Sequence, residues 1–153
     1  MEFEDEVEKL LVTNFSVLEL HLNTKGHVFG ALVVRLLKIY HIRTNTQKLK
    51  VVLPWWFQMP QEARCLRNCL CDEPKDWRNQ NISLTRLEEV EINNFTGRDL
   101  EVDFLKLIFR WAPMLTRMIV KLAYAIKQIA WPVLLAIKIC SLLRFKSLAS
   151  ESV

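Results

Sequence analysis

Short segments in which apolar and polar residues alternate recur along the whole chain, and this recurrence limits the fold more than any other feature. The segments cover residues 15–22, 48–53, 87–92 and 115–122. A period of two is typical of β-strands with one buried face. Each segment has one apolar anchor: Leu18, Leu49, Val90 and Met118. The anchors lie 31, 41 and 28 residues apart, so the chain contains an irregular repeat.

Two segments with a helical period lie between these strands. From residue 27 to 42, apolar residues form one stripe: Phe29, Leu32, Val33, Leu36, Leu37 and Tyr40. Residues 99–112 form the second predicted helix, and Pro113 ends it. Its first turn holds Asp99, Glu101 and Asp103, where carboxylates suit the positive end of the helix dipole. Strands joined by helices predict a parallel sheet with right-handed crossovers.

The alternation of strands and helices resembles irregular leucine-rich repeats, in which each strand lines one face and each helix backs it. We therefore predict an α/β fold: a short leucine-rich-repeat-like solenoid with parallel strands, followed by an apolar C-terminal helix. The strand–helix–strand units cover residues 1–53 and 84–122. Residues 54–83 form a long connection that contains cysteine and tryptophan, and residues 123–153 form an apolar, basic tail.

Three cysteines are crowded into the long connection, at Cys65, Cys69 and Cys71. A structural zinc site usually combines separated ligand pairs, and no histidine lies within twenty residues of this cluster. A loop with reduced thiols is the favoured interpretation, while zinc and a redox-sensitive pair stay open. We expect Trp77 to pin this loop to the protein body. Residues 55–57, "WWF", would either cover a core edge or form a partner patch.

Motifs for catalysis or cofactor binding are absent from the sequence. There is no GxGxxG, Walker A, HExxH or GxSxG pattern, and the chain has only three glycines and three histidines. We therefore expect no enzyme activity, no cofactor and no metal. A basic face with interleaved aromatic residues is also missing, which argues against nucleic-acid binding.

Both ends of the chain bear on where the protein resides. The start, "MEFEDEVEKLL", lacks the basic and then apolar pattern of a signal peptide, so we expect a cytoplasmic or nuclear protein. Residues 123–145 are nearly all apolar, but Lys127, Pro132 and Lys138 interrupt them. A buried helix and an interfacial helix with snorkelling lysines both fit this pattern. The alternative localisation is therefore a membrane-associated one.

Three blocks of sequence resemble the C-terminal part of plant F-box proteins that have leucine-rich repeats and an FBD domain. They are "GHVFGALVVRLLKIYHIRTNTQKLKVVLP" (26–54), "CDEPKDWRNQNISLTRLEEVEINNFTG" (71–97) and "VDFLKLIFRWAPMLTRMIVKL" (102–122). The resemblance implies a role in which an N-terminal F-box docks to the adaptor of an SCF-type ubiquitin ligase while the repeats hold the substrate. It also implies that the cysteine loop needs no metal.

Two features depart from this family. No F-box is visible, so docking to the SCF adaptor is expected only if an F-box exists upstream. The tail after Leu122 replaces the polar helix and closing strand that the resemblance implies, and this puts the C-terminal cap in doubt.

From the strand pattern and the resemblance together we expect a protein-binding module for an unidentified protein substrate. Its partner would bind at outward strand positions: His21, Lys50, Glu89, Glu91 and Lys121. The alternatives are a small membrane-associated protein anchored by residues 123–145 and a truncated copy without function.

Overall fold

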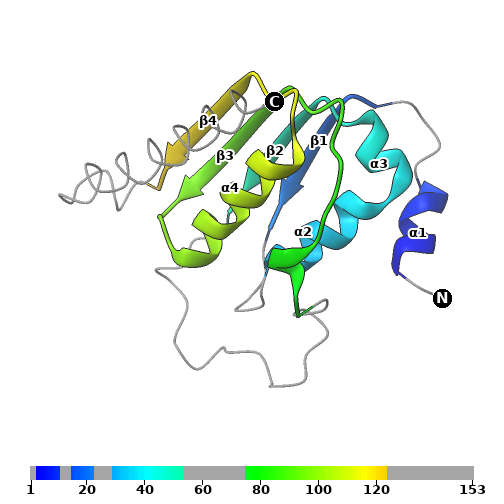
Figure 1. The fold of residues 1–153 in the computed structure, drawn as a ribbon, viewed down its shortest axis with the longest axis horizontal. Coiled ribbons are helices and arrows are strands. Elements are labelled where there is room, and N and C mark those ends of the chain that lie inside the picture. Colours follow the sequence, from blue (N-terminus) through cyan, green and yellow to red (C-terminus); the bar gives the residue numbers. More distant parts are fainter. Residues whose placement is uncertain (1–2, 11–14, 23–28, 54–74, 124–153) are drawn as a thin grey trace.

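The computed structural model describes residues 3–10, 15–22, 29–53 and 75–123 (Figure 1). Its elements, in chain order, are α1 (Phe3–Leu10), β1 (Val17–His21), α2 (Phe29–Lys38), α3 (Tyr40–Asn45), β2 (Lys48–Val52), the 3-10 turn η4 (Trp77–Asn79), β3 (Glu89–Phe95), α4 (Asp99–Trp111) and β4 (Arg117–Leu122). The four predicted strands and both predicted helical regions are present. Helix α1 was not predicted; its Val7 packs against the core.

The four strands form one parallel sheet in the order β1-β2-β3-β4, as predicted. The four anchors occupy a single cross-strand row, because Leu18 pairs with Leu49, Leu49 with Val90, and Val90 with Met118. The unequal spacings between the anchors therefore reflect connections of different length, while the anchors of neighbouring strands stay directly paired.

The strands also begin in the same way. Ser16 O accepts hydrogen bonds from the N–H groups of Gln47 and Lys48, and Gln47 O accepts from those of Glu88 and Glu89. The carbonyl of Glu88 repeats the pattern with the next strand, accepting from Thr116 and Arg117. The start of each strand is therefore hydrogen-bonded to the start of the next strand in the same way.

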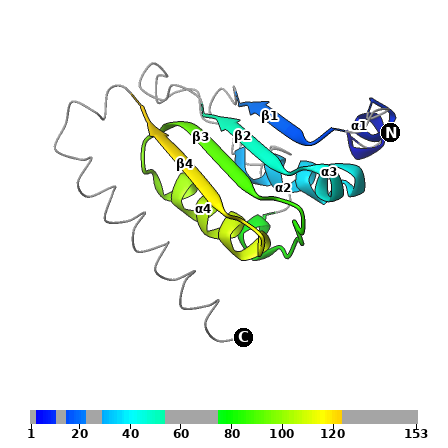
Figure 2. The ribbon, with the colours of Figure 1, turned by 90° about the horizontal axis from the view of Figure 1, so that it is seen from above.

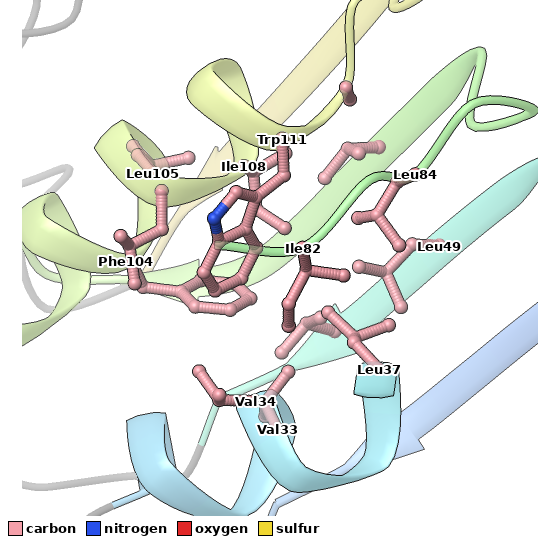
Figure 3. Close-up of a cluster of buried hydrophobic side chains, with 14 of the residues drawn as sticks. Val33, Val34, Leu37, Leu49, Ile82, Leu84, Phe104, Leu105, Ile108 and Trp111 are labelled. Carbon is pink, nitrogen blue, oxygen red and sulfur yellow. The ribbon is translucent and has the colours of Figure 1, made fainter. Parts of the chain in front are cut away.

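Helices α2 and α4 lie on the same face of the sheet, and the core lies between them and the strands (Figure 2). Figure 3 shows Val33, Val34 and Leu37 of α2 pointing toward the side chains of α4 and the sheet. The inward residues of the two central strands, together with Leu53 directly after β2, are at most 2% exposed: Leu49, Val51, Leu53, Val90, Ile92 and Phe95. This is the burial expected of a period-two pattern over one covered face.

The continuous helix predicted from residue 27 to 42 is instead two helices that meet at Ile39. Ile39 has extended backbone angles (φ −60°, ψ 125°) and precedes α3, so the chain changes direction there. The break lets Ile39 and Ile42 enter the core. It also turns Tyr40 outward, where it is 60% exposed, so its placement in the apolar stripe was wrong. Ala31 and Val34 are buried in the stripe instead.

The third strand runs further than the predicted segment 87–92, because β3 continues through Asn93 and Asn94 to Phe95. The pairing with β4 is irregular between Ile92 and Phe95. Asn94 sits in the left-handed region (φ 62°), which asparagine tolerates better than most residues, and its Nδ2 donates to Leu53 O at 3.2 Å. This bulge returns the apolar Phe95 to the core.

The start of α4 is built around a buried carboxylate. Glu101 is 1% exposed, and its Oε2 accepts from the backbone N–H groups of Thr96, Gly97 and Arg98 at 2.9, 2.7 and 3.2 Å. Glu101, predicted as a favourable acid in the first turn of α4, therefore stabilises the start of this helix as a buried capping group and not as a surface charge. Burial raises the pKa of Glu101, and the hydrogen bonds from Thr96, Arg98 and Gly97 oppose the rise.

The connection before β3 is tied to both helices. Trp77 is fully buried, as predicted, and a Cβ on Gly30 of α2 would lie 2.6 Å from its ring. On the other side, Trp111 Nε1 and Arg110 Nη2 of α4 each donate to Gln80 O at 2.9 Å. This segment therefore joins α2 to α4.

Several predictions concern residues outside the described ranges. These are the cysteine cluster, the aromatic residues 55–57, and the tail from residue 124 onward. Ala123 is described: it is buried, and its N–H donates to Phe95 O at 3.0 Å. Within the described residues, no helix has the length and apolar character needed to cross a membrane.

Candidate functional site: the polar face of the sheet

Figure 2 shows the face of the sheet opposite α2 and α4. Every strand contributes at least one charged residue to this face. We call it the polar face and define it by Glu19, His21, Lys48, Lys50, Glu89, Glu91, Arg117 and Lys121. It arises because side chains alternate across a strand, so the residues between the buried apolar positions must point the other way. All five residues predicted from the sequence lie on this face.

The charges change sign from one strand to the next. One cross-strand row runs from Val17 through Lys48 and Glu89 to Arg117, and the next runs from Glu19 through Lys50 and Glu91 to Ile119. Strands β1 and β3 are therefore acidic on this face, while β2 and β4 are basic. Opposite charges at directly facing positions stabilise a sheet, and like charges destabilise it.

Ion pairs follow this alternation across all three strand boundaries. Lys50 Nζ lies 3.5 Å from Glu19 Oε1, and Lys48 Nζ lies 2.8 Å from Glu89 Oε1. Arg117 Nη1 lies 3.7 Å from Glu89 Oε2, so Glu89 is held between two cations. Lys121 Nζ donates to Glu91 Oε1 at 2.8 Å. Four of the five predicted residues are therefore connected through partners on neighbouring strands: Lys50, Glu89, Glu91 and Lys121.

The central glutamates of β3 are the most enclosed charges of this face. Glu91 is 8% exposed, and the hydrogen bond from Lys121 lowers the pKa of its carboxyl group, with further help from Asn93 and Lys50. The hydrogen bond from Lys48 lowers the pKa of Glu89 in the same way and raises the pKa of Lys48. Both glutamates are thus held in the charged form at neutral pH.

His21 and Glu19 form the β1 side of the polar face. His21 Nε2 lies 2.5 Å from Glu19 Oε1, and both side chains are well exposed. This hydrogen bond lowers the pKa of Glu19, and Lys50 adds to the effect. The Glu19 carboxylate, the His21 imidazole and the Lys50 ammonium group therefore lie close together and are accessible to solvent.

The partners that sequence reasoning missed are Glu19, Lys48 and Arg117. Each lies an even number of positions from a predicted residue on its own strand, so the period-two rule could have found all three. The pairing between strands could not be found that way, because it depends on the register.

Among the described residues, no group of three or more histidine, cysteine, aspartate or glutamate side chains is close enough to hold a metal. Hydrogen-bonding and charged groups in an open, rigid array are suited to recognising another molecule by charge complementarity.

One comparison with known proteins bears on this surface. The FBD family model matches residues 83–120, fewer than half of the chain. The matched segment holds all of β3 and α4 and most of β4, so it includes Glu89, Glu91 and Arg117 and ends just before Lys121. No curated protein and no solved structure matches the chain. The match supports a protein that contains an FBD region, which is consistent with a protein-interaction module.

Proposed function

We propose that this chain is a non-catalytic protein-binding module resembling the substrate-recognition part of an F-box ubiquitin ligase, acting in the cytoplasm or nucleus. The partner is a protein substrate that contacts the polar face. Recruitment of the SCF adaptor would require an F-box, which such proteins carry upstream of their repeats. The observation that carries the proposal is the polar face itself, on which eight polar residues from all four strands lie together on the side of the sheet opposite α2 and α4.

The wider repeat architecture is part of the same proposal. The shared anchor row and the repeated strand starts support a short solenoid, because each strand is placed by the strand before it in the same manner. In a solenoid the strands line one continuous binding surface, and here that surface is the polar face. The FBD match over β3 and α4 supports the same interpretation for the second unit.

A charge-swap variant tests this function without removing an ion pair. In E91K/K121E the two partners exchange places, so the contact between them can persist while the local charge pattern is inverted. The matched control is E6K/K9E, which inverts the exposed pair on α1, where Lys9 Nζ lies 3.2 Å from Glu6 Oε1. Proteins captured from cell extract by each immobilised variant would be compared quantitatively with those captured by the wild type.

The proposal expects at least one protein that is captured by the wild type and by E6K/K9E but lost with E91K/K121E. That protein, once purified, should bind the wild type directly in a salt-dependent manner. Identical capture by all three folded proteins, checked by circular dichroism, would contradict a binding role for the polar face.

A further inference from the structure

The outer edge of β1 presents backbone groups in the arrangement that a further strand would need. Strand β1 lies at one end of the sheet order. Ser16 O accepts from Lys48 N, and Leu22 N donates to Val52 O, so the even-numbered residues direct their backbone groups toward β2. Backbone groups alternate in direction along a strand, and those of Val17, Glu19 and His21 therefore point away from the sheet. Among the described residues, none pairs with them.

The inward side chains of β1 are only half covered. Leu18 and Leu20 are partly buried, whereas their row neighbours on β2, Leu49 and Val51, are 0% exposed. The difference arises because β2 has a strand on both sides and β1 has one. Apolar side chains on an added strand would bury the remaining surface of both leucines.

Strand β1 also lacks the usual protection of an edge. It pairs with β2 in unbroken register from Val17 to His21 and contains no proline, lysine or bulge, which are common ways of blocking further pairing. Val17, at its start, is 53% exposed. The only acid on this strand is Glu19, and the sheet alternates acid, base, acid and base from β1 to β4.

We infer that the outer edge of β1 accepts an extended segment of a partner protein, in which apolar residues alternate with polar ones and a lysine or arginine lies opposite Glu19. Backbone hydrogen bonds to Val17, Glu19 and His21 hold the segment. Its apolar residues cover Leu18 and Leu20, and its cation continues the alternation of charge across the polar face.

A second copy of this chain fits the edge less well. Two β1 strands related by a twofold axis run antiparallel, and the register that overlaps all five residues places Glu19 against Glu19. Like charges in facing positions destabilise strand pairing. The sign of the charge therefore favours a basic partner segment over self-association.

The inference is tested with the full chain and two synthetic peptides, TVTVKVTVT and TVTVEVTVT, each carrying a short polyethylene glycol group for solubility. They differ only in the central charge. Binding is measured by fluorescence anisotropy, and backbone amide hydrogen exchange is followed by NMR at saturating peptide. The protein variants are Glu19→Lys, Glu19→Pro and, as a control for net charge, Glu88→Lys, since Glu88 is exposed and lies away from β1.

The lysine peptide should bind the wild type about threefold or more tightly than the glutamate peptide, the range expected for facing charge pairs. Glu19→Lys should invert that preference, and Glu88→Lys should leave it unchanged. Glu19→Pro removes an outward N–H, which an edge strand tolerates, and should abolish binding of both peptides. Binding should slow exchange at Val17, Glu19 and His21 while leaving Leu18 and Leu20 unchanged.

Absence of binding at about 1 mM peptide would overturn the inference, as would a peptide preference that Glu19→Lys does not alter. Exchange protection that falls elsewhere than on the three outward amides would do the same. These outcomes are separate from the test of the polar face, because Glu91 and Lys121 lie on β3 and β4 and are not changed here.

Discussion

Lys121 Nζ lies 2.8 Å from Glu91 Oε1 even though the two residues do not face each other across the sheet. The Cα partner of Glu91 is Ile119, and Lys121 is two residues further along β4. The contact is therefore diagonal, and the long lysine side chain spans it. It covers the glutamate and explains why a charge on the open face is almost as buried as a core residue.

Acidification should first raise and then lower the stability of the fold. The pKa values of Glu19, Glu89 and Glu91 lie below the ordinary value of 4.5, so the stability they contribute is present above pH 4.5 and is lost as pH falls through their lowered values. The pKa of Glu101 is raised, so its protonation in the folded state adds stability as pH falls toward 4.5. Urea unfolding across this range would measure the profile; a monotonic rise in stability down to pH 2 would contradict it.

Removal of the Glu101 carboxylate should destabilise the fold by about 2 to 3 kcal/mol, because Glu101→Ala removes the charged acceptor shared by the part-buried N–H groups of Thr96, Gly97 and Arg98. Glu101→Gln should cost less than about 1 kcal/mol, since its amide oxygen can take the place of Oε2 and Thr96 Oγ1 can accept from its NH2 group. Urea unfolding measures both, with the exposed Glu88→Ala as a control. Equal losses for the two Glu101 variants would rule out the capping role.

Gly30 should be needed because of Trp77. An alanine at position 30 would place its Cβ 2.6 to 2.8 Å from three atoms of the indole ring, and that ring is fully buried. We expect Gly30→Ala to cost about 1 to 3 kcal/mol by overpacking, even though alanine is the better helix former.

The same substitution in a Trp77→Phe background should be close to neutral or stabilising, because the smaller ring relieves the clash. A double-mutant cycle from thermal or urea unfolding measures this coupling. Additive effects of the two substitutions would show that Gly30 and Trp77 do not act on each other.

Asn94 should tolerate glycine better than alanine. Its φ of 62° is strained for a residue with an ordinary side chain, and its amide also donates to Leu53 O. Asn94→Ala loses the hydrogen bond and keeps the strain, for a cost of about 1 to 2 kcal/mol. Asn94→Gly loses the bond but relieves the backbone, so its cost should be smaller. Urea unfolding of the two variants tests this prediction: the unfolding midpoint of Asn94→Gly should be higher than that of Asn94→Ala.

Much of this fold could be predicted from local pattern. Alternation at Leu18, Leu49 and Val90 identified the strands and their buried faces, and the same rule placed all five predicted residues on the polar face. Pro113 and the acidic first turn located α4 to within one residue at its end. These features follow from side-chain periodicity and from residues that restrict the backbone, which act within a few positions of the chain.

The remaining features depend on contacts between distant segments. The break at Ile39 occurs because burial of Ile39 and Ile42 outweighs the continuous helical stripe, and the bulge at Asn94 occurs because Phe95 is drawn into the core. The sequence by itself determined which residues face the polar side. The tertiary structure alone decided which charges meet, because register is set by how whole strands pack over one core, and a shift of one residue would change every partner.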